Sequence, residues 1–521
     1  MKIIVPMTGV GKRFVEAGYK DLKPLIKVHG IPIIEYVTKL FPGEEDIIFV
    51  CRQDALADIA ELRTTLERIA PKSKIVGIEG HKLGPVYAVS KVFDLIDDDE
   101  QVIVNYCDFF MNWDYADFKK TVNEAGCDGA IPCYTGFHPS LIPEKNLYAG
   151  CKIDADKYLL EIKEKYSYTA NKFESEHSAG TYYFKKGSYV KKYFQELMDR
   201  KMDLNGEYYV SMVYELLIEA GLKTLVYDKV PQFCQWGTPE DFSDYLYWSG
   251  IFENIARLSP AIESSANKLI PMAGAGSRFV EEGYTTPKPL LEVLSKPMVV
   301  QAMDALPGAG NEIFICRDFH ITDYQIDTKL KQHYPEAAIV QVKELTEGQA
   351  STCLLAKDLI NNDEELMIGA SDNGMIYDAV MFESMKQDYD ALVFSFRNNQ
   401  CVVAKPQQYG WIKTNGTDVI AVSVKKAISD DPMNDHAIVG SFWFKQGSLF
   451  VAAAEAMIKA DTRINNEFYV DEAINNLVAM GKKVGVFEID YYICWGTPND
   501  YRSFEYWQQF FADADFHSYK R

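Results

Sequence analysis

An internal repeat constrains the fold of this chain more than any other feature. Residues 6–28 read PMTGVGKRFVEAGYKDLKPLIKV and residues 271–293 read PMAGAGSRFVEEGYTTPKPLLEV, which gives 14 identities in 23 positions. Unrelated segments of that length would share about one or two identities. A duplicated segment specifies the same local structure twice, so we expect two copies of one domain.

The same register returns along almost the whole of each half. NGEYYV at 205–210 corresponds to NNEFYV at 465–470, and the motif QWGTPEDF corresponds to CWGTPNDY. The offset falls from 265 residues at the first motif to 259 at the last, and loops absorb such small deletions easily. We therefore predict one domain over residues 1–250, a connector over 251–267 and a second domain over 268–521.

Composition and charge narrow the class of protein. A chain of 521 residues with 47% hydrophobic and 25% charged residues is ordinary for a folded protein with two cores. The formal net charge of −21 argues against nucleic acid or an anionic membrane as the main partner. A phosphate ligand would need local Lys, Arg and backbone N–H groups, together with a divalent cation, to reverse the field at its site.

Cysteine usage and the N-terminus point to the cytoplasm. The ten cysteines are scattered, with no C-x-x-C pair and no Cys/His cluster at zinc spacing, so we expect neither a disulfide framework nor a structural metal. The opening segment MKIIVPM is apolar over too few residues for a signal peptide or a membrane span. We expect a cytoplasmic protein, and its oligomeric state stays open, a homo-oligomer included.

Each half opens with an α/β pattern. A short apolar run, KIIVPM or KLIPM, leads into a Gly-containing loop, and further apolar runs such as EDIIFVC and NEIFIC alternate with amphipathic stretches. This order of strands and helices predicts a Rossmann-like α/β domain in each half, with a mostly parallel mixed sheet flanked by helices. Ligand sites are expected at the carboxyl ends of the strands.

Glycine-rich loops follow the first strand of each half. Two glycines let backbone N–H groups approach an anion, and the arginine that follows, Arg13 or Arg278, can clamp phosphate oxygens. The loops lack the third Gly of a dinucleotide fingerprint and the G-K-[ST] ending of a P-loop, and a plain strand-to-helix turn is the alternative. The predicted NTP-binding residues of these loops are Gly9, Gly11 and Lys12 in the first half and Gly274, Gly276 and Ser277 in the second.

A Lys-Pro-Leu segment lies ten residues beyond each arginine, at Lys23 and Lys288. The whole pattern, G-x-G-x-R-F, then G-Y, then K-P-L, resembles the nucleotide-sugar pyrophosphorylases, also called sugar-1-phosphate nucleotidyltransferases. The second copy is the closer match, because the first has Leu22 where the second has Pro287. The resemblance implies that the loop and its arginine hold a triphosphate while the lysine neutralises charge near the reacting phosphorus, and arginine and lysine together are the predicted catalytic residues.

A carboxylate ends a hydrophobic strand in each half, Asp108 in NYCD and Asp372 in GASD. Such a carboxylate suits Mg²⁺, which keeps several waters and bridges phosphates, and the resemblance implies a metal ligand here. Many members of the family carry a second Asp directly before a segment like V-G-T-P. This chain has Gln235 and Cys494 there, so Gln235 is a doubtful ligand through its amide oxygen.

The resemblance also implies an acceptor side. Lys165 is similar to the family's lysine that holds the sugar phosphate, and the second half offers Lys425 or Lys426 in an ambiguous register. Surface lysines are the alternative. The other predicted acceptor-binding residues are Gly180 and Glu207 in the first half and Gly440 and Glu467 in the second.

The two copies differ where the nucleobase would be recognised. Gly348 and Gln349 lie in EGQAS, which is similar to the family's base-binding G-Q-A segment, whereas the first half has Gly84 in LGPV. We therefore expect that the two halves recognise different nucleobases or different partners, or that one half binds its ligand without catalysing a reaction.

These features favour transfer of a nucleotidyl group from an NTP to a sugar-1-phosphate or another small phosphate, with Mg²⁺ as cofactor and pyrophosphate as the second product. The resemblance adds surface polysaccharide precursor synthesis as a setting. A nucleotide-sugar glycosyltransferase is one alternative, although neither strand-end Asp belongs to a D-x-D pair. A nucleotide-binding regulatory protein with one or both sites inactive is the other.

Overall fold

The computed structural model describes residues 1–257, 266–274, 276–308 and 310–520 and divides into two units. The first unit comprises Met1–Leu246 together with Tyr506–Arg521, and the second comprises Tyr247–Glu505. This differs from the expected second domain of 268–521, because the last residues of the chain pack with the first unit. Of the expected connector 251–267, the first part continues helix α9 (Pro239–Arg257), and residues 258–265 lie outside the described residues.

The first unit is built on one mixed sheet. Its strands run in the order β10-β9-β11-β8-β12-β6-β1-β4-β5, and β13 pairs with β8. Their bounds are β1 (Lys2–Met7), β4 (Ile47–Arg52), β5 (Lys74–Ile78), β6 (Val102–Asn105), β8 (Gly129–Tyr134), β9 (Gly150–Ile153), β10 (Leu159–Lys163), β11 (Glu176–Ser178), β12 (Thr181–Phe184) and β13 (Thr224–Tyr227).

The sheet of the second unit has the order β19-β18-β15-β20-β25-β22-β26-β24-β23. Strands β15, β18, β19 and β20 take the places of β1, β4, β5 and β6, and β25 follows β20 as β12 follows β6. Beyond this block the two sheets differ, since the first has ten strands and the second nine. The bounds are β15 (Asn267–Met272), β18 (Glu312–Arg317), β19 (Ala338–Val342), β20 (Leu366–Ile368), β22 (Ala391–Phe396), β23 (Gly410–Asn415), β24 (Asp418–Val424), β25 (His436–Phe444) and β26 (Val484–Glu488).

Both sheets are mixed rather than mostly parallel. The block β5-β4-β1-β6 is parallel, as is β19-β18-β15-β20. The next strand along, β12 or β25, is antiparallel to this block, and further antiparallel pairs follow it. The order of apolar runs in the sequence predicts the parallel βαβ part of each sheet. In the aromatic-rich second part of each half, no sequence pattern indicates whether the strands are parallel or antiparallel.

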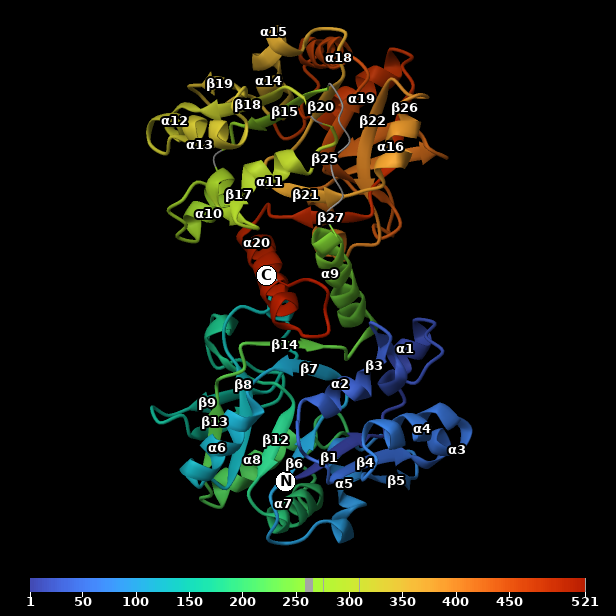
Figure 1. The fold of residues 1–521 in the computed structure, drawn as a ribbon, viewed down its shortest axis with the longest axis vertical. Helices are drawn as coiled ribbons and strands as arrows, with labels where there is room; N and C mark the ends of the chain where they lie inside the picture. The colour runs from blue at the N-terminus through green and yellow to red at the C-terminus, as the bar shows by residue number, and fades with distance from the viewer. Residues whose placement is uncertain (258–265, 275, 309, 521) are drawn as a thin grey trace. The chain divides into compact units, whose positions relative to one another are not determined.

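Helices cover the sheets and bury their apolar faces. In the first unit Ile4 and Val50 of the sheet share a core with Val89, Val190 and Val213 of three helices. Figure 1 shows the helices of this unit around its sheet. The helices of this unit include α1 (Lys12–Glu16), α2 (Ile33–Lys39), α3 (Gln53–Asp58), α4 (Ala60–Ile69), α5 (Gly84–Ser90), α6 (Tyr115–Ala125), α7 (Gly187–Asp199) and α8 (Val210–Glu219).

The second unit repeats this helix order around its own core. Its helices include α10 (Ser277–Glu281), α11 (Met298–Asp304), α12 (Asp318–Thr322), α13 (Ile326–His333), α14 (Gln349–Cys353), α15 (Lys357–Ile360), α16 (Ala379–Met385), α18 (Gly447–Lys459), α19 (Val470–Ala479) and the first part of α20 (Pro498–Asp513). Strand β1 and its counterpart β15 are almost wholly buried, as expected for strands covered on both faces.

A two-stranded antiparallel ribbon lies beyond the carboxyl end of each central sheet. In the first unit β7 (Phe109–Asn112) pairs with β14 (Gln232–Gln235), and in the second β21 (Asn373–Ile376) pairs with β27 (Tyr491–Cys494). Each ribbon joins the segment after the strand-end Asp to the segment before the WGTP motif. It therefore brings two motifs that are far apart in the sequence to the same edge of the sheet.

Candidate functional site

A lysine and an aspartate meet at the carboxyl end of the first unit's sheet. Lys23 Nζ lies 2.5 Å from Asp108 Oδ2 and also donates to the carbonyl of Gly237 at 3.0 Å. Their side chains are 17% and 29% exposed, so the pair is partly shielded from water. Burial disfavours the ammonium ion, but the charge and hydrogen bond of Asp108 outweigh it, and the pKa of Lys23 is raised. This lysine stays charged.

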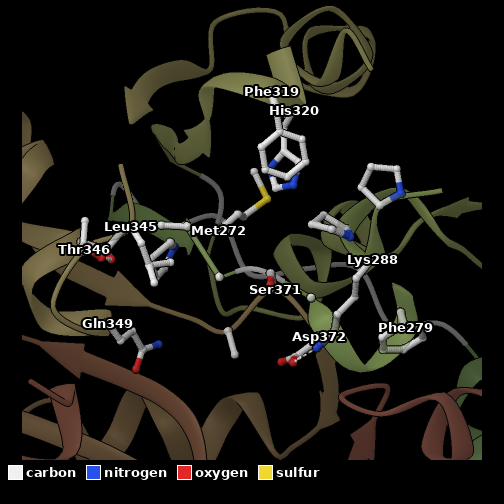
Figure 2. Close-up of a pocket in the computed structure, with 18 of the residues that line it drawn as sticks. Met272, Phe279, Lys288, Phe319, His320, Leu345, Thr346, Gln349, Ser371 and Asp372 are labelled. Atoms are coloured by element: carbon white, nitrogen blue, oxygen red, sulfur yellow. Dashed lines mark hydrogen bonds and ion pairs between the residues drawn. The ribbon is translucent and has the colours of Figure 1, made fainter. Parts of the chain in front are cut away.

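The second unit repeats the arrangement. Lys288 Nζ forms an ion pair with Asp372 and donates to the carbonyl of Gly496 at 3.1 Å. Figure 2 shows Lys288 and Asp372 directed toward each other at one side of a pocket. Both lysines begin a short turn in which proline is the next residue, and this turn directs the side chain toward the strand end.

The WGTP motifs fix the glycine carbonyls that accept from the lysines. The backbone N–H of Trp236 donates to the Asp108 carbonyl at 2.7 Å, and that of Trp495 donates to the Asp372 carbonyl at 2.8 Å. Both tryptophans are buried. The repeat singles out this motif, but no sequence signal indicates that its glycine completes the lysine site in each half.

A hydrogen-bonded cap follows each WGTP motif. The Thr238 hydroxyl donates to Asp241 at 2.8 Å and accepts from the Asp241 backbone N–H at 3.1 Å. Thr497 and Asp500 make the same two contacts at 2.7 and 3.2 Å. This reciprocal pattern is a capping box, which starts helices α9 and α20 directly behind the lysine site.

The strand-end aspartate of each unit is the predicted ligand of a divalent cation. Asp108 and Asp372 each use one oxygen, Oδ2, for the lysine, and Mg²⁺ is commonly held by one or two carboxylates with phosphates and water. The residue before each WGTP motif adds no carboxylate: Gln235 donates its amide to Asp241, and burial raises the pKa of the Cys494 thiol well above its usual value. The donor set fits a cation that takes its remaining ligands from the substrate.

The glycine loops adopt the conformation that glycine favours. Gly11 and Gly276 both have φ near +62°, directly before helices α1 and α10. A Cβ on Gly11 would lie 3.5 Å from the Cβ of Lys23, and one on Gly276 would lie 3.7 Å from that of Lys288. Each loop therefore packs on its lysine, while Gly9 and Gly274 are exposed.

The side chains that follow the glycines point outward. Arg13 and Arg278 are exposed, and Arg13 is near enough to Lys23 to oppose its charge. Lys12 forms a surface ion pair with Glu16 at 3.4 Å, one helical turn away. Their assignment to the triphosphate, and that of the exposed Ser277, stays a prediction.

In the second unit these elements border a cavity of about 440 Å³. Figure 2 shows Thr346 and Gln349 on the side opposite Lys288 and Asp372, with Ser371 between them. Among the predicted site residues, those that line the cavity are Gly274, Gly276, Lys288, Gly348, Gln349, Asp372 and Glu467. Arg278 is not among the lining residues.

The loops expected to recognise the base have the same anchor in both units. Gly84 and Gly348 have positive φ, and a Cβ on either would lie 2.8 or 2.6 Å from the backbone of Tyr208 or Phe468. The N–H of Tyr208 donates to the Leu83 carbonyl at 3.0 Å, and the second unit has the equivalent bond. The loops are thus alike in backbone and differ in the next residue, a proline in one unit and a glutamine in the other.

The structure resolves the register on the acceptor side. Lys165 has φ +54° and Lys425 has φ +58°, and their ammonium groups lie 5.7 and 5.6 Å from the rings of Tyr209 and Tyr469. Lys425 rather than Lys426 is therefore the counterpart of Lys165. The two tyrosines were not predicted, although both occupy the same place in the repeated NGEYYV and NNEFYV segments.

The remaining acceptor candidates also match between units. Tyr209 and Tyr469 each donate a 2.6 Å hydrogen bond to the carboxylate two residues earlier, Glu207 or Glu467. Gly180 and Gly440 have φ of +95° and +92°, a conformation that disfavours any side chain there.

Comparison with known proteins finds a family match in the second half. Residues 268–508 match the family model described as nucleotidyl transferase. This match covers less than half of the chain and supports the expected class of enzyme, a nucleotidyltransferase.

Individual relatives are distant. A curated relative, the bifunctional protein GlmU of Carboxydothermus hydrogenoformans, is 24% identical over 223 residues, which are 42% of this chain and 47% of that protein. The chain thus spans about half the length of this relative. Similar solved structures include a nucleoside-diphosphate-sugar pyrophosphorylase from Vibrio cholerae RC9, at 22% identity and TM-score 0.39, covering 46% of this chain and 98% of that one. Another is an inositol-1-phosphate CTP transferase from T. maritima, at 12% identity and TM-score 0.38, and the match covers 48% of this chain and 98% of that one.

Among the helices of the described residues, none combines the length and the apolar character that crossing a membrane requires.

Proposed function

We propose that this chain transfers a nucleotidyl group from an NTP to a sugar-1-phosphate or a similar small phosphate, and that both units carry a site for it. The observation that carries the proposal is the repeated triad of a charged lysine, a strand-end aspartate and a glycine carbonyl beside a glycine loop. The nucleotidyl transferase match of residues 268–508 supports the same reaction class.

In the proposed reaction an oxygen of the acceptor phosphate attacks the α-phosphorus. The new P–O bond forms as the bond between the α-phosphorus and the bridging oxygen breaks, and pyrophosphate leaves with the electron pair. Lys23 and Lys288 would stabilise the charge that develops on the phosphoryl oxygens. Lys165 and Lys425, each beside a tyrosine ring, would hold the acceptor phosphate.

Asp108 and Asp372 would hold Mg²⁺ through their carboxylates. When bound, the cation would supply charge neutralisation at the phosphates. Each carboxylate is held by its ion pair with the lysine, and Gln235 is a further candidate ligand in the first unit through its amide oxygen.

The test is pyrophosphate release by the full chain. The protein is incubated with each of the four NTPs, Mg²⁺ and a panel of sugar-1-phosphates and polyol phosphates. We expect release with at least one pair, and no release with any pair would contradict the proposal. NTP binding without release would instead favour a regulatory binding protein.

Single variants identify the active unit. Asp108→Asn and Asp372→Asn should each reduce turnover in their own unit at least about 100-fold, because each removes charge from the centre of a site. Asp117→Asn is the matched control, since that carboxylate pairs with Lys229 at the surface. Full activity of both site variants with every pair would refute the assigned role of these aspartates.

A further inference from the structure

A buried histidine lines the cavity of the second unit without a partner for one of its ring nitrogens. His320 is 2% exposed and borders the cavity. Among the described residues, no group hydrogen-bonds its Nδ1. Its ring lies 4.2 Å from that of Phe319, measured between the ring centroids. Buried polar atoms are nearly always hydrogen-bonded, so an orphan at a cavity wall indicates a ligand that supplies the partner.

The sheet topology places this histidine at the end of the cavity away from the charged pair. Strand β18 lies between β15 and β19 and is parallel to both, so the segment after it emerges between the glycine loop and the Thr346–Gln349 loop. Figure 2 shows His320 and Phe319 beside Met272, with Lys288 and Asp372 on another side of the pocket. The phosphates belong with the charged pair, which leaves the uncharged part of an NTP for this end.

At the two corresponding positions the first unit has no side chain that can form a hydrogen bond. Arg52 and Arg317 end the corresponding strands and begin the next helices in the same extended conformation, which aligns Ala55 with His320. In the loop across the cavity, Pro85 stands where the second unit has Gln349. Alanine and proline offer no side-chain hydrogen bond, so the second unit alone carries a polar pair at these two positions.

We propose that His320 is a specificity-determining residue that hydrogen-bonds the nucleobase of the NTP in the second unit through Nδ1. The inference rests on the proposed function, because it assumes that an NTP occupies this cavity. Gln349, half-buried on the opposite wall, would contact another polar group of the same base.

The charge state of His320 favours a base over a phosphate. Burial, with a smaller effect of the Arg317 guanidinium, lowers the pKa of His320 to about 4. The imidazole is therefore neutral near pH 7 and carries one N–H donor and one acceptor lone pair. A neutral ring gives little attraction to a phosphate, whereas either nitrogen state can match a donor or an acceptor on the edge of a base.

The experiment measures binding to the full chain by calorimetry with Mg²⁺ and five probes: ATP, GTP, CTP, UTP and inorganic tripolyphosphate. His320→Ala removes the ring. His320→Asn places an amide atom at the position of Nδ1, whereas His320→Gln reaches the position of Nε2. His333→Ala is the matched control, because His333 is exposed and does not line the cavity. The first unit has Ala55 at the position of His320, so its affinity for each NTP serves as an internal reference.

We expect His320→Ala to raise the Kd of the preferred NTP about tenfold at one class of sites and to narrow the differences among the four NTPs. Tripolyphosphate, which has no base, should bind within about twofold of its wild-type affinity. His320→Asn should recover binding better than His320→Gln, and His333→Ala should match the wild type.

Two results would overturn the inference: unchanged affinities of His320→Ala for all four NTPs, or an equal loss for the NTPs and for tripolyphosphate, which would mark a structural role. A wild-type protein that binds no NTP would refute the proposed function itself, so the two failures are distinguishable.

Discussion

Single residues set the charge at each site. Lys23 is mostly buried, and a buried lysine without a partner would lose its proton more easily. Asp108 reverses that tendency, so the lysine stays a cation beside the glycine loop. The same pairing of Lys288 with Asp372 repeats this arrangement in the second unit.

Replacing Asp108 with Asn should therefore lower the pKa of Lys23 below the ordinary lysine value, because burial is the largest effect on this lysine and would lose its main opposing group. Nuclear magnetic resonance of the labelled lysine side chain during a pH titration measures it. In the control Asp117→Asn, exposed Lys229 loses the partner that raises its pKa and should only return to the ordinary value. Equal shifts at both lysines would contradict the role of burial.

His138 predicts a dependence of stability on pH. Its Nε2 donates to the Phe233 carbonyl and its Nδ1 accepts from the Ser140 N–H, so the neutral ring is fully used. Burial lowers its pKa to about 3, below the unfolded value near 6.5. The unfolded chain thus binds the extra proton first, and the stability that the neutral ring contributes is present above pH 6.5 and lost as the pH falls toward 3.

Denaturant unfolding between pH 6.5 and 4 measures this effect. His138→Asn keeps an acceptor for the Ser140 N–H but does not titrate. As the pH is lowered, the unfolding free energy of this variant should therefore fall less steeply than that of the wild type, and the two slopes should differ by up to about 1.4 kcal/mol per pH unit. Other histidines titrate alike in both proteins and cancel in the comparison. Parallel pH profiles would show that His138 is not the group responsible.

At the scale of elements, backbone contacts position the loops around each site. The ribbon β7–β14 and its counterpart β21–β27 bring the WGTP glycine to the strand-end Asp. The loop at Gly348 is pinned to the segment before α19 by hydrogen bonds through Phe468. These contacts leave no room for a side chain at the loop glycine.

Gly348→Ala should damage both stability and NTP binding, because its Cβ would lie 2.6 Å from the backbone of Phe468. Gly283→Ala is the matched control, since Gly283 also has positive φ but open space around it. The control should lower the free energy of unfolding by about 1–3 kcal/mol through backbone strain. Gly348→Ala should lower it by about 1–3 kcal/mol more, because of steric overlap with Phe468. Thermal unfolding and calorimetry measure the difference; equal costs would mean that the loop moves aside.

At the scale of the whole molecule, the unit boundaries fall inside helices. Residues from 506 onward belong to the first unit, whereas the start of α20 belongs to the second. Tyr506 accordingly packs on aromatic rings of the first unit, and its ring centroid lies 5.0 Å from that of His138. Its hydroxyl accepts a hydrogen bond from the Phe233 N–H at 3.1 Å. Two residues earlier, Phe504 packs on Phe252 in the second unit.

Alanine variants at these two positions should act on different units. Tyr506→Ala should reduce hydrogen-exchange protection in first-unit peptides, and Phe504→Ala in second-unit peptides, each by a local cost of about 3–5 kcal/mol for a buried aromatic side chain. The two variants are matched controls for each other, because they lie in one helix. Equal loss of protection in both units from either variant would contradict this division.

The sequence by itself determined the repeat, the βαβ start of each half and the residue types at the carboxyl edge of the sheet, because periodicity and spaced motifs are local properties of a chain. Only the tertiary structure decided that the WGTP glycine accepts from the lysine, that Lys425 is the counterpart of Lys165, and that the last residues complete the first unit. Those relations depend on antiparallel pairing and packing between segments far apart in the chain, which no local pattern encodes.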